Sequence, residues 1–197
     1  MKFLKILGLI ILVIIVAIGI TGMLLSGEAK MERSIVINAP VEKVFNELNT
    51  FKNVYEWSPW MKLDPNLKAE FSGPDYGVGA KYTWQSEDPN VGNGSQVLTE
   101  SRENEYIKTE MTFDMPGENY AEYILSPEGE GTRVTWTYYG QTSQFAMKFM
   151  MLGIDSFLGP LYEQGLADLK TYIEGLPDPE PLIEETMEAD TTAVSEE

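Results

Sequence analysis

The residue types available for chemistry in this chain of 197 residues are tyrosine, threonine and the carboxylates, because histidine and cysteine are both absent. Their absence removes the commonest general base, the thiol nucleophile and the usual zinc ligands. Tyr82, Tyr123 and Tyr138 could serve as acids or bases only with a perturbing neighbour, since the pKa of an ordinary tyrosine is about 10. The sequence indicates no catalytic constellation, and we expect neither a metal nor another cofactor.

Two patterns resemble enzyme motifs but lack the surroundings that such motifs need. The glycine run at residues 73–79 precedes a predicted strand instead of opening a helix, and no Lys-Ser or Lys-Thr pair follows it, so we reject a phosphate-binding loop. Glu110 and Glu122 lie on the outer side of predicted strands, whereas a glycosidase needs two carboxyl groups that converge in a cleft. These patterns give little support to catalysis.

The central part of the chain reads as consecutive antiparallel strands separated by Gly, Pro and Asn turn signals. Together with a first strand expected at residues 34–37, the sheet should contain about seven strands. Asn93-Gly94 is a typical tight-turn pair. The remaining strands are predicted at residues 68–72, 81–85, 96–102, 105–114, 119–125 and 132–139.

Two helices must accompany this sheet. The first, at residues 41–48, follows a proline that suits a first helical turn, and its apolar side chains recur at i, i+3, i+4 and i+7. The second is predicted at residues 144–174, with a kink or break at Gly159-Pro160. Gly165 indicates a close approach to another backbone.

Alternation along the strands separates an uncharged inner face from a charged outer face. In one strand Thr109, Met111 and Phe113 share a side, and Lys108 and Glu110 lie on the other. An uncharged aromatic face beneath a methionine-rich helix suits an apolar ligand that carries one or two hydrogen-bonding groups. The same side chains could equally fill an ordinary core. The predicted lining of the cavity is Trp57, Trp60, Tyr82, Trp84, Thr109, Met111, Phe113, Tyr123, Trp136, Tyr138, Met151 and Phe157.

Residues 6–25 are uncharged, and fourteen of these twenty are Leu, Ile or Val. A run of this length can cross a bilayer as a helix. We therefore expect a short tail at residues 1–5, a membrane anchor at 6–25, a link at 26–30 and the folded domain at 31–176. A cleaved signal peptide is the competing interpretation. Lys2 and Lys5 nearly balance Lys30 and Arg33, so the orientation with the N-terminus in the cytoplasm and the domain outside is a hypothesis.

The net charge of −17 and the isoelectric point near 4.3 argue against a nucleic-acid partner, which would require clustered basic residues. Residues 177–197 contain eight acidic side chains, no basic ones and three prolines. Such a composition is typical of a disordered tail, and this one could recruit a protein partner.

Several local motifs resemble the START-like superfamily, which is also called SRPBCC and is described as polyketide cyclase/dehydrase or lipid transport. The resemblance covers about residues 31–176 and implies an α+β helix-grip fold (START/Bet v 1-like), in which a curved antiparallel sheet is closed by a long C-terminal helix over an apolar cavity. Members bind lipids, sterols, polyketides or other hydrophobic molecules, and some are enzymes. The motifs are Ala39-Pro40 before the first helix, Trp57-Ser58-Pro59-Trp60, Gly77-Val78-Gly79-Ala80 before Trp84, Gly131-Thr132-Arg133-Val134-Thr135-Trp136, and Tyr162-Glu163-Gln164-Gly165-Leu166.

The leading functional hypothesis is a membrane-anchored module that binds a hydrophobic small molecule or lipid. One alternative is a cyclase- or dehydratase-like enzyme that uses the inner tyrosines together with a buried carboxylate. The other is a domain whose interior is filled by its own side chains and whose acidic surface or tail binds a protein.

Overall fold

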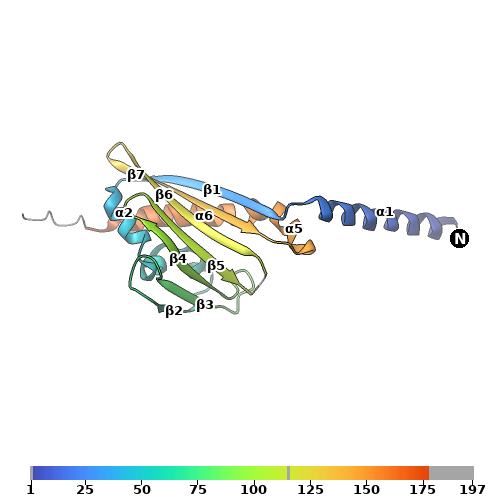
Figure 1. The fold of residues 1–197 in the computed structure, drawn as a ribbon, viewed down its shortest axis with the longest axis horizontal. Helices are drawn as coiled ribbons and strands as arrows, with labels where there is room; N and C mark the ends of the chain where they lie inside the picture. Colours follow the sequence, from blue (N-terminus) through green and yellow to red (C-terminus); the bar gives the residue numbers. More distant parts are fainter. Residues whose placement is uncertain (1, 115, 178–197) are drawn as a thin grey trace, which may run out of the picture.

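The computed structural model describes residues 2–114 and 116–177, and it contains one seven-stranded antiparallel sheet in the order β1-β7-β6-β5-β4-β3-β2. The predicted acidic tail, apart from Pro177, lies outside the described residues. Figure 1 shows α6 running along one face of the curved sheet and α1 projecting away from the domain. The strands are β1 Glu28–Ile37, β2 Lys68–Ser72, β3 Lys81–Gln85, β4 Gly94–Arg102, β5 Tyr106–Phe113, β6 Glu118–Glu128 and β7 Gly131–Gln141. The helices are α1 Lys2–Leu24, α2 Val41–Leu48, the 3-10 turn η1 Phe51–Asn53, α3 Val54–Trp57, α4 Pro59–Leu63, α5 Phe145–Leu152 and α6 Ile154–Gly175. This arrangement is the predicted helix-grip fold.

The first strand is much longer than the sequence pattern suggested. β1 begins at Glu28 and pairs with β7 over its whole length, from Glu28 opposite Gln141 to Ile37 opposite Thr132. Residues 28–30, which we expected to form part of a link, therefore belong to the sheet, and only residues 25–27 separate it from α1. The sequence pattern did not reveal this extension, because β1 is an edge strand whose exposed side carries polar residues.

Asn93-Gly94 is not a tight turn, contrary to our prediction. Gly94 already belongs to β4, where it pairs with Trp84 and Phe113, and residues 86–93 form the connection from β3. A Cβ atom on Gly94 would lie 2.5 Å from Cζ2 of Trp84, so glycine at this position makes room for the indole.

The long C-terminal helix is interrupted at Gly153 and continues through Gly159-Pro160, where we predicted the break. Pro160 is accommodated because α6 is held against the core by the buried Tyr162, Leu166 and Leu169 after it and the partly buried Leu158 before it, which outweighs the lost backbone hydrogen bond. Gly153 is exposed, and its own N–H bonds to the carbonyl of Met150 as a helix end. The break therefore falls where packing is weakest.

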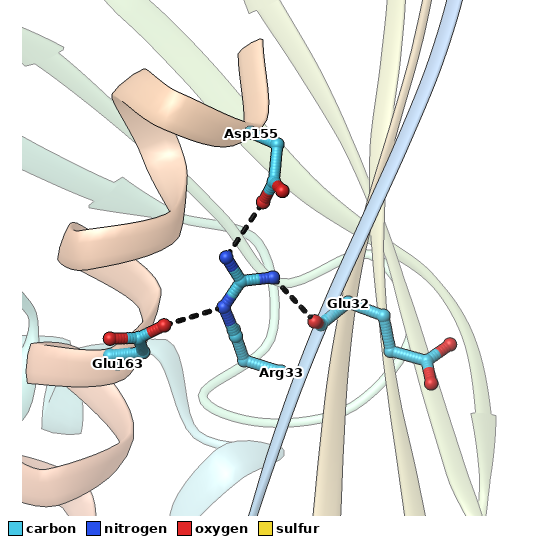
Figure 2. A network of polar contacts seen from close by, with 4 residues as sticks. All are labelled: Glu32, Arg33, Asp155 and Glu163. Carbon is cyan, nitrogen blue, oxygen red and sulfur yellow. Dashed lines mark hydrogen bonds and ion pairs between the residues drawn. The ribbon is translucent and has the colours of Figure 1, made fainter.

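Arg33 connects the edge strand β1 to α6 (Figure 2). Its Nε donates to Oε1 of Glu163 and its Nη2 donates to Oδ1 of Asp155, both at 2.7 Å, while Nη1 donates to the carbonyl of Glu32 at 2.9 Å. A Cβ atom on Gly159 would lie 2.4 Å from Nη2 of Arg33, so the glycine makes room for the guanidinium group. These contacts hold the first half of α6 against the edge of the sheet.

Within the described residues, α1 is the one helix that is long and apolar enough to cross a membrane, with a mean hydropathy of 3.1. It begins at Lys2, so residues 2–5, which we expected to be a tail, are helical. Its last turn contacts α5 through Gly22 and Phe145.

Candidate ligand-binding site

The inner face of the sheet is uncharged, as the alternation predicted. Along β5 the inner residues Ile107 and Thr109 are fully buried, whereas the outer residue Glu110 is exposed. The inner residues of β7 are buried as well, from Thr132 to Tyr138. The sheet therefore presents an apolar surface with few polar atoms to α6.

The centre of this face is an aromatic cluster around Trp136 on β7. The Trp136 indole stacks on Tyr162 of α6 with ring centroids 3.8 Å apart, and on Tyr123 of β6 at 5.2 Å. Trp57 and Trp60, from the short helices that follow α2, meet Trp136 edge to face at 5.6 and 5.9 Å. Four elements, α3, α4, β6 and α6, thus contact this one side chain. The motif Trp57-Ser58-Pro59-Trp60 supplies the contacts from α3 and α4.

Two indole N–H groups in this cluster have no hydrogen-bond partner among the described residues, namely those of Trp57 and Trp136. The two side chains are 5% and 4% exposed. A buried N–H group without an acceptor costs about 1–3 kcal/mol, so such groups are rare in folded proteins. The inner face therefore contains two adjacent residues that can donate to an acceptor atom.

A second aromatic group surrounds Tyr82 on β3, and its hydroxyl is already in use. Tyr82 Oη donates to Oε1 of Gln96 at 2.9 Å, and Nε2 of Gln96 donates to Oγ1 of Thr109 at 2.6 Å. Trp84 lies beside Tyr82, with ring centroids 5.3 Å apart. Tyr82 and Thr109 were two of the expected polar contacts for a ligand, but their hydroxyl groups are hydrogen-bonded to the side-chain amide of Gln96.

The inner tyrosines are poorly suited to act as bases. Burial raises the pKa of Tyr82 and of Tyr123 well above that of a free tyrosine, and it raises the pKa of Tyr138 to about 12. Each is thus a neutral phenol at neutral pH, able to donate a hydrogen bond but not to abstract a proton readily. Tyr138 donates to Oδ1 of Asn119 at 2.6 Å.

Met111 and Phe113 lie at a half-buried rim of the inner face. In the sheet register Met111 lies opposite Asn119, Asn119 opposite Gly140, and Gly140 opposite Ala29. Ala29 is the second residue of β1, so this row crosses the end of the sheet to which α1 is joined. The rim of the candidate site therefore lies at the same end of the domain as α1.

The structure brings ten of the twelve predicted residues to the inner face and leaves Met151 and Phe157 away from it. Phe157 is 54% exposed, because the buried stripe of α6 runs through Leu158, Tyr162 and Leu166. Met151 lies half-buried on α5, beyond the helix break at Gly153. Expecting one continuous helix extended the apolar stripe into α5, where it does not continue.

Sequence reasoning missed two members of the site, Gln96 and Tyr162. Gln96 occupies an inner position two residues before Leu98, but a polar residue in an apolar alternation was not counted. Tyr162 was noted as part of a motif and not as a partner of Trp136. The spacing of Tyr162 from Leu166 and Leu169 places it on the buried stripe of α6 and could have identified it.

Two depressions on the surface of the described residues are lined by none of the twelve predicted residues. The larger, of about 670 Å³, lies at the far end of the sheet, where the β4–β5 turn (residues 102–106) faces Val41 and residues 124–127. The other, of about 80 Å³, lies beside Phe51 and residues 71–75. The space between sheet and helix is occupied mainly by the aromatic side chains themselves.

Solved structures with the same fold are distant in sequence. The solution structure of the KanY protein (ms6282) has a TM-score of 0.55 at 17% identity, covering 76% of this chain and 99% of that one. An uncharacterised protein from Rhizobium leguminosarum has a TM-score of 0.54 at 15% identity, covering 75% and 95%. The di-domain ARO/CYC protein BexL from the BE-7585A biosynthetic pathway has a TM-score of 0.54 at 12% identity, covering 77% of this chain and 52% of its own. At these identities the likeness establishes the fold alone.

No curated protein matches the chain in a sequence comparison. A family model does match, over residues 28–174, which begin with the first residue of β1 and end one residue before the end of α6. The matched segment thus contains the whole sheet, α2 and all but the last residue of α6. The chain belongs to the family described as polyketide cyclase / dehydrase and lipid transport.

Proposed function

We propose that this protein is a membrane-anchored module that binds a hydrophobic small molecule or lipid between the sheet and α6. The inner face supports this proposal because it is uncharged and rich in aromatic side chains. Membership in a family associated with lipid transport and polyketide chemistry points to the same class of ligand.

The observation that carries the proposal is the pair of indole N–H groups on Trp57 and Trp136. A ligand with a carbonyl, hydroxyl or ester oxygen between these residues would accept the hydrogen bonds that the protein does not supply, while its hydrocarbon portion contacts the surrounding rings. The favoured ligand is thus apolar over most of its surface and carries an acceptor group.

Binding requires the aromatic cluster to open, because Tyr162 of α6 stacks directly on Trp136. The rim at Met111 and Phe113 is the half-buried end of this face. We propose that the ligand enters at this rim and that α6 moves relative to Trp136. The contacts of Arg33 with Asp155 and Glu163 are accessible to solvent and can break at moderate cost.

Membrane attachment is the second part of the proposal. Helix α1 has the length and composition of a single spanning segment. Lys2 and Lys5 on one side of α1 nearly balance Lys30 and Arg33 on the other. We propose the orientation in which Lys2 and Lys5 are cytoplasmic and the domain lies outside. A cleaved signal peptide would instead release the domain.

Native mass spectrometry tests the ligand-binding proposal. The full chain would be extracted in mild detergent from the membranes of its own host and examined for added mass. A discrete hydrophobic adduct on the wild type, which is lost from the double variant Trp57→Phe/Trp136→Phe, is the expected result.

Tyr120→Phe is the control, because it also removes a hydrogen-bond donor from an aromatic side chain but lies on the outer face of the sheet, where Tyr120 stacks on Tyr139. This variant should retain the adduct. A wild-type chain that carries no adduct, or an adduct retained equally by the double variant, would refute the proposed site.

A further inference from the structure

Helix α5 exposes an apolar surface that the fold of the domain does not use. Seven of its eight residues are apolar and none is buried. Phe145, Met150 and Leu152 are 46%, 53% and 68% exposed. A helix that is apolar on all sides is normally enclosed by other elements, and a contiguous exposed apolar patch marks an interaction site.

Helix α5 lies beside the end of α1, and this position indicates what its exposed apolar surface faces. A Cβ atom on Gly22, in the last turn of α1, would lie 2.2 Å from Cε2 of Phe145, so the phenylalanine ring rests directly on the backbone of α1. Lys148 Nζ donates to the carbonyl of Leu25 at 2.8 Å, and the N–H of Thr142 donates to the carbonyl of Gly27 at 2.9 Å. Helix α5 is thus held beside the end of the candidate spanning helix.

The depth of α5 relative to the membrane follows from the geometry of α1. At about 1.5 Å per residue, Gly22 lies only about 3 Å from the end of α1 at Leu24. If α1 spans the bilayer, this end lies at the boundary between acyl chains and headgroups, and so does Phe145. Phenylalanine is among the residues that interfacial helices bury at the boundary between headgroups and acyl chains.

The charges of the residues in and next to α5 support its placement at the membrane interface. The segment of residues 142–154 contains no acidic side chain in a chain that has 31, and its one charged residue is Lys148. Lysine near an interface extends its ammonium group toward water and headgroups while its stem stays in an apolar environment. The segment that contains α5 therefore carries none of the negative charge that would keep the rest of the domain away from lipid.

We propose that α5 docks into the interface of the same bilayer that holds α1, with Phe145, Met150 and Leu152 immersed among the lipids. An eight-residue helix needs little intrinsic affinity for lipid, because α1 keeps it at a high effective concentration beside the membrane. This inference rests on the anchoring part of the proposed function and deepens it. It directs the rim at Met111 and Phe113 toward the bilayer and makes the membrane the source or destination of the ligand.

Fluorescence quenching in nanodiscs of phosphatidylcholine and phosphatidylglycerol tests the inference with the full chain. Because the protein has no cysteine, Met150→Cys and Leu152→Cys each provide a unique site for bimane, and both side chains are exposed, so labelling does not disturb a core. The control is Tyr76→Cys, which is also exposed but lies on the β2–β3 loop that contacts the end of α2, at the opposite end of the domain from α1 (Figure 1).

The expected result is a shift of bimane emission to shorter wavelength at positions 150 and 152, with stronger loss of fluorescence from spin labels placed near the lipid headgroup than from spin labels near the acyl-chain end. The label at position 76 should show neither effect. Labels at 150 and 152 that are shielded from an aqueous quencher but insensitive to spin-labelled lipid would mean that protein covers α5, which overturns the inference.

Alkaline carbonate extraction of the same chain separates this inference from the function on which it rests. A chain that stays in the membrane while its labels at 150 and 152 resemble the label at 76 contradicts the docking of α5 alone. A chain that carbonate releases contradicts the anchor and the docking together. Ligand binding is measured independently by the adduct.

Discussion

Trp136 of β7 and Tyr162 of α6 stack with their ring centroids 3.8 Å apart and an interplanar angle of 25°. This contact joins the middle of the sheet to the middle of the helix that closes it. Gly165 lies less than one turn after Tyr162, where an added Cβ would be 3.0 Å both from Cζ3 of Trp136 and from Cδ of Pro59. The close contact between α6 and the sheet thus depends on the absence of a side chain at position 165.

We expect Gly165→Ala to destabilise the domain by about 1–3 kcal/mol, because the neighbouring indole and proline rings are rigid and must move. Urea unfolding of the full chain in detergent measures this change in the free energy of unfolding. Gly175→Ala is the matched control on the same helix, since nothing lies within 4 Å of the added Cβ. The control should leave stability unchanged or raise it by up to about 1 kcal/mol, as alanine does in helices. Equal effects of the two substitutions would show that Gly165 has no special packing role.

The sequence predicted most of the fold because local patterns report which side of an element faces the core. The bounds predicted for β2 and β3, Lys68–Ser72 and Lys81–Gln85, are confirmed at both ends, and the predicted apolar stripe from Val41 to Leu48 lies on α2. Gly94 was misinterpreted as a turn and Gly159 as part of a helix break, and the break at Gly153 was missed, for one shared reason. Whether a glycine makes a turn, ends a helix or makes room for a neighbouring ring depends on contacts with residues distant in the sequence, which periodicity does not reveal.

The candidate site was only partly predictable. Alternation identified Tyr82, Thr109 and Trp136 as inner residues, and the structure places all three on that face. Alternation does not say which inner groups bond to one another, so it could not show that Tyr82 and Thr109 are satisfied through Gln96. It also could not show that the indole of Trp136 is left with no acceptor among the described residues.

The hydrogen-bonded chain from Tyr82 through Gln96 to Thr109 should behave as one energetic unit. Thr109→Val removes the acceptor of the Gln96 amide in a fully buried position, so we expect a loss of about 1–3 kcal/mol in the free energy of unfolding. In a Gln96→Leu background the same substitution leaves no unpaired amide and should cost less. A double-mutant cycle by urea unfolding measures the difference, which should be about 1 kcal/mol or more. A coupling energy near zero would contradict the connection between these residues.

Stability should fall in alkaline solution because burial raises the pKa of Tyr138 to about 12 in the folded state. Below a pH of about 10 the side chain is neutral in both states, so its contribution is constant. Between about 10 and 12 the unfolded chain ionises while the folded protein keeps the proton, and stability is lost, by up to about 2.7 kcal/mol above pH 12. Tyr82, Tyr123 and Tyr162 act in the same direction.

Tyr138→Phe isolates this residue, because phenylalanine does not ionise. The variant also loses the hydrogen bond to Asn119, which lowers stability by a similar amount at every pH below 10 and leaves the slope unaffected. Urea unfolding at several alkaline pH values should show a shallower decline for Tyr138→Phe than for the wild type. Parallel declines would mean that Tyr138 titrates alike in the folded and unfolded chains.

The contact between Gly22 and Phe145 should determine how firmly α5 is held at the end of α1. A valine at position 22 would place its Cβ between 2.2 and 2.9 Å from three carbons of the Phe145 ring, so the ring must leave its place on α1, and α5 loses this contact. Gly19→Val adds the same side chain less than one turn earlier on α1, where nothing lies within 4 Å. Both substitutions are equally apolar, so membrane insertion of α1 should be equal in the two variants.

Hydrogen exchange of the α5 amides, measured with the full chain in nanodiscs, distinguishes the two variants. A strain of about 1–3 kcal/mol corresponds to roughly 5- to 150-fold faster exchange in Gly22→Val. Exchange in Gly19→Val should match the wild type, and carbonate extraction should confirm that both variants remain in the membrane. If Gly22→Val exchanges no faster than Gly19→Val, the packing of Phe145 on α1 does not hold α5 in place, and its position would depend on Lys148 and the lipid alone.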